Sequence, residues 1–144
     1  MIVKQILGSK GSSEIYWVKP ASKVSEAAAL MSEHRIGTVV VSEDGTTLVG
    51  ILSERDIVRE IGKRGSDCLD EAVSKMMTER IITCGEKDSA DSILAKMTEG
   101  RFRHIPVMRD DRMLGLISIG DVVKARLSQL SMEKDALEGM IKGY

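Results

Sequence analysis

The chain has 144 residues, 42% hydrophobic and 30% charged, as in soluble globular proteins of one or two small domains. Its 21 basic and 22 acidic side chains give a net charge of −1, which excludes the strong basic field of a non-specific nucleic-acid binder. Apolar runs such as residues 37–41 are strand-length, far short of the roughly 20 residues that cross a bilayer. Residues 1–7 are also too short for a secretory signal. We therefore expect a cytoplasmic protein that binds neither nucleic acid nor membrane.

The chain contains an internal repeat, in which residues 18–58 match residues 83–123 element by element. Apolar residues at helical spacing predict a helix that opens at Val24 in one copy and at Ala90 in the other. β-branched segments then predict two strands in each copy, and each second strand leads into another helix. Each copy is therefore a β-α-β-β-α unit. The expected fold class is α/β (α+β), with two repeats packed about a pseudo-twofold axis.

Local signals predict how these elements start and turn. Ser22 and Asp88 stand just before the first helices and are the expected N-caps, because their side-chain oxygens can accept free backbone N–H groups. Asp44-Gly45 and Asp110-Asp111 separate the two strands of each copy, so each strand pair is expected to be a hairpin. The first turn is one residue longer than the second. A hairpin loop is the place where a duplicated domain tolerates such an insertion or deletion.

The connection between the copies begins with glycines and charges at residues 62–66. Residues 67–77 are predicted to form a short connecting helix, and the last helices of the two copies are expected over 56–61 and 121–130. These boundaries predict three parts: a first repeat with its N-terminal segment, a second repeat with the connecting helix, and a C-terminal helical extension, over residues 1–65, 66–130 and 131–144.

Metal chemistry has little support in the sequence. Cys68 and Cys84 form no C-x-x-C pair, and the only histidines are His34 and His104, so we expect no metal site and a reducing compartment. Residues 122–141 have apolar side chains at helical spacing, which predicts a packing helix or, alternatively, a helix that supplies contacts between subunits.

The motif Gly-x-x-Ser-x-x-Asp ends the second strand of each copy, at residues 50–56 and 115–121. Its serine is placed at a helix N-terminus, where free N–H groups suit a phosphate. Its aspartate can accept two hydrogen bonds from a ribose diol. A serine followed three residues later by an acidic residue is also a capping box, and duplication copies caps as well as sites. The local pattern therefore leaves a ligand site and a helix cap both open.

Basic residues are distributed unequally around the two motifs. Arg101, Arg103 and His104 gather at the start of one strand in the second copy, whereas Gly37 and Thr38 occupy the equivalent place in the first. Such basic groups can balance a phosphate, although ordinary solvated arginines would give the same pattern. The two motifs are therefore not expected to be equivalent.

These features together resemble a tandem pair of cystathionine β-synthase (CBS) domains of the small stand-alone bacterial type. The resemblance rests on the two motifs and on Arg103-His104-Ile105-Pro106-Val107, and it covers residues 2–130. It implies two repeats packed about a pseudo-twofold axis with two clefts between them, and dimerisation into a flat disc. It further implies that the clefts bind an adenosine-containing ligand, with AMP expected first and ATP or NAD as alternatives, and that no metal is required.

The resemblance also implies which residues form the clefts, since each cleft combines the motif of one copy with strand residues of the other. Asp56 and Asp121 would hold ribose, Arg103, His104 and Lys10 would face phosphates, and apolar residues would enclose adenine. The first cleft would comprise Ile51, Ser53, Asp56, Met77, Thr78, Ile82, Phe102, Arg103 and His104. The second would comprise Leu116, Ser118, Asp121, Lys10, Gly11, Tyr16, Ile36, Gly37 and Thr38.

The expected function is a regulatory module that senses an adenine nucleotide and responds by a change of shape or oligomeric state. An enzyme is not expected, because the chain lacks a P-loop, a metal cluster and a paired nucleophile and base. The alternative is an interaction or scaffold homodimer whose clefts stay empty. The sequence names no protein target.

Overall fold

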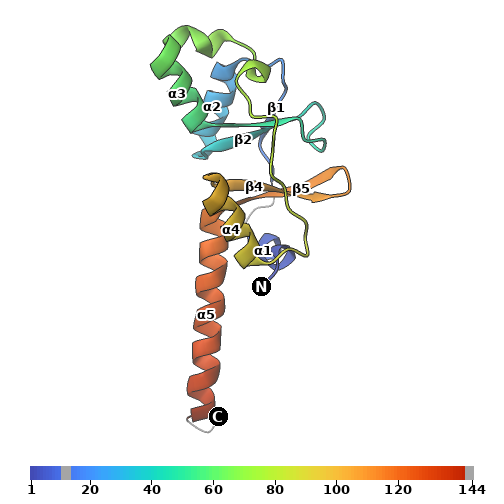
Figure 1. Ribbon diagram of the computed structural model, residues 1–144, viewed down its shortest axis with the longest axis vertical. Coiled ribbons are helices and arrows are strands. Elements are labelled where there is room, and N and C mark those ends of the chain that lie inside the picture. The colour runs from blue at the N-terminus through green and yellow to red at the C-terminus, as the bar shows by residue number, and fades with distance from the viewer. Residues whose placement is uncertain (11–13, 142–144) are drawn as a thin grey trace. The chain divides into compact units, whose positions relative to one another are not determined.

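A computed structural model of the protein describes residues 1–10 and 14–141 and divides the chain into two compact units. The first-repeat unit consists of Glu14–Ile82 with Arg109–Leu114, the tip of a later hairpin. The second-repeat unit consists of Met1–Ser13, Thr83–Met108 and Gly115–Tyr144. The N-terminal segment therefore groups with the second repeat, although the first repeat follows it in the chain. Figure 1 shows both units and labels their α-helices and most of their strands.

The first-repeat unit has the element order that the sequence predicts. Its sheet has the order β1-β2-β3, with β1 parallel to β2 and β2 antiparallel to β3. All four side chains of β2 are buried, as expected for a β-branched strand covered on both faces. Helix α2 packs Val24, Ala27 and Met31 into the same core. The elements are β1 (Trp17–Val18), α2 (Val24–His34), β2 (Thr38–Val41), β3 (Gly50–Ser53), α3 (Glu54–Arg64) and the 3-10 helices η1 (Ser66–Asp70) and η2 (Val73–Lys75).

The second-repeat unit repeats this pattern, except that its first strand shrinks to one parallel bridge between Cys84 and Val107. Strands β4 and β5 pair through the predicted turn at Asp110-Asp111, where Asp110 has a φ of 55°. Buried side chains of α4, β4 and β5 form its core. The elements are α1 (Val3–Ser9), α4 (Ala90–Gly100), β4 (His104–Arg109), β5 (Arg112–Ser118) and α5 (Ile119–Ile141).

Each repeat is covered by the segment that precedes the other repeat. Ala72 forms an antiparallel bridge with Lys23 in the first-repeat unit, and Ile2 forms the equivalent bridge with Ser89 in the second-repeat unit. Backbone carbonyls of these segments accept from the first N–H group of each helix, Glu71 from Val24 at 2.9 Å and Met1 from Ala90 at 3.0 Å. Those bonds supply N–H partners that a helix start otherwise lacks.

Three local expectations are corrected by these bridges. The N-cap of α2 is Lys23, without a side-chain cap, in place of Ser22. The N-cap of α4 is Ser89, whose hydroxyl accepts from Ser92 N, while Asp88 instead accepts from Gly85 N at 2.8 Å. The helix expected over 67–77 is two 3-10 helices, because the extended backbone that pairs with Lys23 interrupts it.

The first hairpin has a longer connection than its Asp44-Gly45 turn predicts, since β2 ends at Val41 and β3 begins at Gly50. Asp44 organises this loop by accepting from the backbone N–H groups of Thr47 at 2.8 Å and Thr46 at 2.9 Å. These bonds hold the pKa of the Asp44 carboxyl well below its ordinary value. The loop also passes close to the Trp17 indole, which would lie 2.9 Å from a Cβ at Gly45.

The helices that follow the two motifs begin earlier than expected and, for α5, end much later. Helix α3 begins directly after Ser53, and α5 begins directly after Ser118 and continues without a break to Ile141. Within the described chain, none of the helices combines the length and apolarity needed to cross a bilayer.

Candidate functional site

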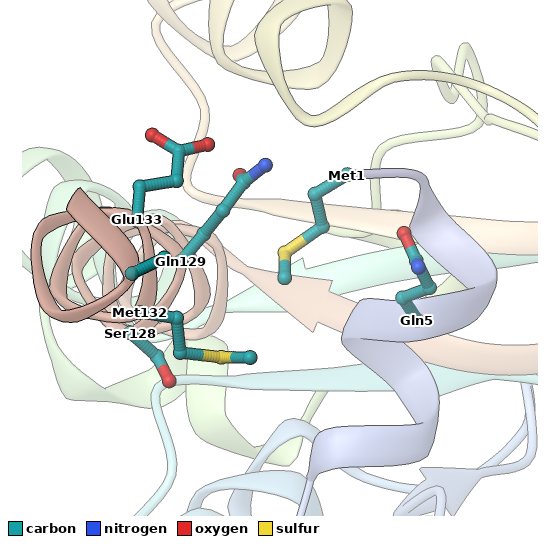
Figure 2. Close-up of a pocket in the computed structure, with 7 residues that line it drawn as sticks. Met1, Gln5, Ser128, Gln129, Met132 and Glu133 are labelled. Carbon is teal, nitrogen blue, oxygen red and sulfur yellow. The ribbon is translucent and has the colours of Figure 1, made fainter. Parts of the chain in front are cut away.

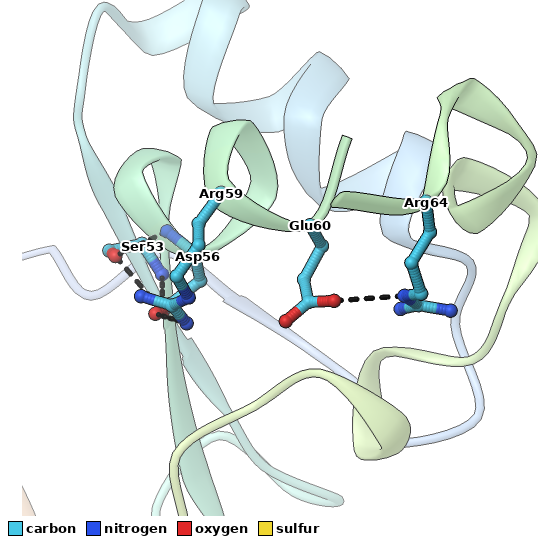
Figure 3. Close-up of polar contacts among 5 residues, drawn as sticks. All are labelled: Ser53, Asp56, Arg59, Glu60 and Arg64. Carbon is cyan, nitrogen blue, oxygen red and sulfur yellow. Dashed lines mark hydrogen bonds and ion pairs between the residues drawn. The ribbon is translucent and has the colours of Figure 1, made fainter. Parts of the chain in front are cut away.

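The Ser53 turn joins β3 to α3 and is closed by reciprocal hydrogen bonds (Figure 3). Ser53 N donates to Asp56 Oδ2 at 2.9 Å, and Asp56 N donates to Ser53 Oγ at 3.2 Å. The Ser53 hydroxyl also donates to Oδ2 at 2.9 Å. Arg59, one turn further along α3, donates to the other oxygen, Oδ1, at 2.9 Å. The turn is thus a complete capping box whose second carboxylate oxygen accepts from a half-exposed arginine.

The motif glycine has a physical role that the sequence alone does not reveal. A Cβ at Gly50 would lie 2.5 Å from Met77 Sδ and 3.2 Å from Thr78 O, so a side chain there would displace the segment that covers β3. That segment is tied to the strand by two backbone hydrogen bonds between Ile51 and Thr78, of 3.0 and 2.8 Å. The structure therefore brings Met77 and Thr78 to the strand that ends in Ser53.

Strand β2 brings a second predicted group to the same turn. Thr38 is the register partner of Ser53. The backbone carbonyl of Gly37 accepts from Glu54 N at 2.9 Å, which fixes the start of β2 to the first residue of α3. Thr38 and Gly37, which the sequence assigns to the other cleft, therefore lie beside the Ser53 turn of their own repeat.

The Ser118 turn has the same reciprocal pattern in the second-repeat unit. Ser118 N donates to Asp121 Oδ2 at 2.9 Å, and Asp121 N donates to Ser118 Oγ at 3.0 Å. Lys10 Nζ lies 3.0 Å from the same Oδ2 and donates to the carbonyl of Leu116 at 2.6 Å. Partial burial raises the pKa of Asp121, but the Ser118 backbone and the Lys10 ammonium outweigh it, and the net pKa is lowered.

Equivalent contacts surround this second turn. A Cβ at Gly115 would lie 2.8 Å from Leu7 Cδ2, so α1 covers β5 as Met77 and Thr78 cover β3. The carbonyl of Arg103 accepts from Ile119 N at 2.8 Å, which matches the bond from Glu54 to Gly37. Lys10 contacts the Asp121 carboxylate of its own unit. The phosphate contact that the sequence analysis expects of Lys10 stays a prediction.

The predicted site residues are thus shared between two half-sites, one in each unit. Tyr16 stacks on His34 with ring centroids 4.0 Å apart, and Ile82 is 48% exposed. Gly11 lies outside the described residues. The first-repeat unit contains Ile51, Ser53, Asp56, Met77, Thr78, Ile82, Tyr16, Ile36, Gly37 and Thr38. The second-repeat unit contains Phe102, Arg103, His104, Leu116, Ser118, Asp121 and Lys10.

Two features of the half-sites escape the sequence reasoning. The first is Arg59, which donates to Oδ1 of Asp56. The signal for this contact in the sequence is a basic residue three positions after the aspartate. The segments that cover the strands also have a matching sequence signal, because Val3 and Leu7 have the same spacing as Val73 and Met77. The repeat therefore extends beyond residues 18–58 and 83–123.

The helix α3 is anchored at its other end by charge pairs. Arg64 Nε donates to Glu60 Oε2 at 2.8 Å (Figure 3), and its Nη1 donates to Glu71 Oε1 at 2.7 Å. The latter bond and the Arg64 charge lower the pKa of Glu71. These bonds connect the end of α3 to the extended backbone that follows η1.

A separate cavity of about 400 Å³ lies between α1 and α5 in the second-repeat unit (Figure 2). The side chains of Met1 and Met132 extend into it from the two sides. Its lining differs entirely from the predicted site and consists of Met1, Gln5, Ser128, Gln129, Met132, Glu133 and Ala136. Across residues 1–10 and 14–141, no three His, Cys, Asp or Glu side chains gather as a metal ion would require.

Comparison with known proteins decides the family. The CBS domain profile matches residues 3–63 and 73–128. The chain belongs to the CBS domain family. A solved CBS-domain protein from Agrobacterium tumefaciens is 40% identical, with a TM-score of 0.83 over 88% of this chain and 99% of that one. The mitochondrial CBS domain-containing protein CBSX3 of Arabidopsis thaliana is 34% identical over 98% of this chain and 72% of that protein.

Two more distant CBS structures share the fold and contain adenosine compounds. A CBS domain protein from Pyrobaculum aerophilum, solved with AMP, is 23% identical, with a TM-score of 0.76 over 92% of this chain and 99% of that one. The CBS domain pair of protein MJ0100, solved with 5′-methylthioadenosine and S-adenosyl-L-methionine, is also 23% identical, with a TM-score of 0.77 over 90% and 98%. At this identity the likeness concerns the fold of the CBS pair.

Proposed function

We propose that this CBS pair is a regulatory module that binds an adenine nucleotide at its two Ser-x-x-Asp turns and performs no catalysis. The observation that carries the proposal is the matched geometry of the two turns. In each, one carboxylate oxygen, Oδ2, closes the helix cap through a backbone N–H at 2.9 Å. The other oxygen, Oδ1, can then accept from a ribose hydroxyl without opening the turn.

The two half-sites support different occupancies. At Asp56, a ribose hydroxyl has to displace Arg59, whose side chain is 52% exposed and therefore costs little to move. At Asp121, Lys10 lies at Oδ2, the oxygen that closes the cap, and also donates to the Leu116 carbonyl, so it does not have to leave for a ribose hydroxyl to reach Oδ1. By the resemblance to CBS pairs, the cleft of Asp56 would include Arg103 and His104 of the other repeat, whereas the cleft of Asp121 would include Tyr16, Gly37 and Thr38. We therefore propose that the Asp56 site binds a phosphorylated ligand more tightly.

The chemistry of the ligand is supported by the family fold. AMP is the ligand of the P. aerophilum protein, and 5′-methylthioadenosine and S-adenosylmethionine are those of MJ0100. Adenosine is common to all three compounds. For this chain we propose AMP first, with ATP and NAD as the other candidates, bound to a homodimer without a metal.

A scaffold homodimer with empty clefts is the competing function. The observation that favours it is that both turns are complete capping boxes, since a cap stabilises its helix by about 1 kcal/mol without any ligand. Under that function the carboxylates serve α3 and α5 alone. A nucleotide would then change neither the stability nor the assembly of the protein.

Calorimetry with AMP, ATP and NAD separates the two functions. Asp56→Asn and Asp121→Asn keep an oxygen to cap the helix but lose the charge that binds a diol. Ser89→Ala is the matched control, because it removes a side-chain cap from α4 at a helix outside the proposed sites. We expect Asp56→Asn to weaken AMP binding about tenfold or more, and Ser89→Ala to leave it unchanged. Wild-type affinity in both Asn variants would refute the site, and loss confined to Asp121→Asn would reverse our ranking.

Regulation requires more than binding, because a ligand shifts an equilibrium only through different affinities for two states. We therefore expect saturating nucleotide to change the sedimentation coefficient or the hydrogen-exchange pattern. If nucleotide binds but changes neither the sedimentation coefficient nor the hydrogen-exchange pattern, the protein binds nucleotide without switching between two states, and the regulatory role is refuted.

A further inference from the structure

Helix α5 carries an exposed apolar stripe along most of its length. Leu127, Leu130 and Leu137 are 62%, 50% and 60% exposed, with Val123 before them and Ile141 after them on the same line. Successive spacings of four, three, seven and four residues are those of a heptad repeat, with Lys134 at the position that interrupts the apolar series. We call residues 123, 127, 130, 134, 137 and 141 the α5 stripe.

The stripe points away from its own unit. Val122 and Ala125 are the buried residues of α5, and Gln129, Met132 and Ala136 face the cavity beside α1. At 100° per residue, Ala125, Met132 and Ala136 lie within about 40° of the side opposite the α5 stripe, and Val122 and Gln129 lie on its flank. The helix also continues beyond residue 128, where the family match ends, and Figure 1 shows its last turns extending past α1 and α4.

We propose that the α5 stripe packs against the α5 stripe of a second copy of this chain, in antiparallel orientation. One register brings the whole stripe into contact with itself, because it places Val123 opposite the partner's Ile141 and Leu127 opposite the partner's Leu137. In that register Leu130 faces the aliphatic part of the partner's Lys134, whose ammonium can reach solvent.

Charges beside the stripe favour the antiparallel orientation. In it, Lys124 comes next to Glu138 of the other helix, so two opposite-charge contacts form across the twofold axis. A parallel pair would put Lys134 against Lys134 inside the seam and Glu133 beside Glu138 at its flank. The antiparallel arrangement brings Glu133 of the two copies close together at the twofold axis, which is unfavourable. The positive charge of the adjacent Lys134 offsets part of this repulsion.

The anchoring and the charge composition of α5 also favour a second copy of this chain as the partner. Burial of Val122 and Ala125 anchors α5 to its own unit, and such packing supplies most of the stability of helices in proteins. A membrane surface is a poorer match, since residues 119–141 hold four acidic and three basic side chains, and surface-binding helices are rich in Lys and Arg.

Sedimentation equilibrium of the full chain without nucleotide measures the association. Leu130→Glu puts a charge into the stripe, and Gln129→Glu puts the same charge one residue away on the other face. We expect Leu130→Glu to weaken the dimer roughly 30-fold or more, with Gln129→Glu close to wild type. A monomeric wild type, or equal dissociation constants for the two variants, would overturn the proposal.

Cross-linking then tests the orientation. Leu127→Cys and Leu137→Cys variants are treated with a short bis-maleimide, with wild type as control because Cys68 and Cys84 are buried. The antiparallel register predicts a cross-link only in the mixture of the two variants, since like cysteines would be about 15 Å apart along the helices. Cross-links within either variant alone would refute it.

A charge exchange provides an independent check of the same contact. Lys124→Glu should weaken the dimer, and adding Glu138→Lys to it should restore the dissociation constant. Failure of the restoration contradicts the antiparallel register. None of these outcomes depends on nucleotide, so this inference and the proposed function can fail separately.

Discussion

Substitution of the motif glycine in the first repeat tests why the Gly-x-x-Ser-x-x-Asp pattern begins with glycine. In Gly50→Ala, the new Cβ would lie 2.5 Å from Met77 Sδ and 3.2 Å from the backbone oxygen of Thr78. The backbone oxygen cannot rotate away, so the segment that holds Met77 and Thr78 has to move off β3. The hydrogen bonds between Ile51 and Thr78 would lengthen with it.

The expected magnitude follows from two opposing effects. Overpacking that shifts backbone costs roughly 1–3 kcal/mol, and replacement of glycine by alanine returns about 0.4–1 kcal/mol through the unfolded state. The net loss of unfolding free energy for Gly50→Ala should therefore be about 1–2 kcal/mol. Gly115→Ala meets only the end of the Leu7 side chain, at 2.8 Å, and should lie within about 1 kcal/mol of wild type.

Urea denaturation measures the unfolding free energy, and hydrogen exchange of the Ile51 and Thr78 amides reports the local displacement. Gly62→Ala is the matched control, because Gly62 lies in α3 with nothing within 4 Å of a Cβ. It should gain about 0.5–1 kcal/mol from helix propensity. If Gly50→Ala is as stable as wild type and keeps full protection at Ile51 and Thr78, the steric reasoning is wrong.

Three further predictions concern titratable groups. Because the pKa of Asp44 is lowered in the folded state, its carboxylate stabilises the fold above its ordinary pKa, and this stabilisation is lost as pH falls. Asp44→Asn should therefore make the unfolding free energy fall less steeply below that pKa. An unchanged slope at acid pH would contradict this prediction. The pKa of Asp121 is also lowered, and Lys10 contributes to this shift, so Lys10→Met should likewise make the unfolding free energy fall less steeply at acid pH. The change should be plainest in the Asp44→Asn background. A steeper fall would refute the pairing of Lys10 with Asp121. Burial, aided by Asp88, raises the pKa of Cys84 to about 11, so native Cys84 should react with a maleimide at pH 8 far more slowly than in urea, and equal rates would contradict its burial.

The sequence predicts the repeated part of the fold because its signals are local. Helical spacing around Val24 and Ala90, the β-branched strand at residues 38–41 and the Asp110-Asp111 turn each specify an element from neighbouring residues. Both Ser-x-x-Asp turns also form the reciprocal bonds that their spacing indicates. Residue chemistry at short range was sufficient in each case.

The remaining features depend on contacts between distant segments. Residues 67–77 have helical periodicity, yet Ala72 is extended because it pairs with Lys23. Ser22 is a good cap residue, but the carbonyl of Glu71 takes the N–H group that a cap would serve. Likewise, the pairing of Lys10 with Asp121 joins residues more than 100 positions apart, and no local pattern indicates it.

The most direct test of the proposed function compares AMP with 2′,3′-dideoxy-AMP by calorimetry. The two ligands differ only in the ribose hydroxyls that Asp56 and Asp121 are proposed to bind. We predict that the wild type binds AMP about tenfold or more tightly than the dideoxy compound, and that an Asp56→Asn, Asp121→Asn double variant binds the two equally. Equal affinities in the wild type, or discrimination that persists in the double variant, would contradict the account.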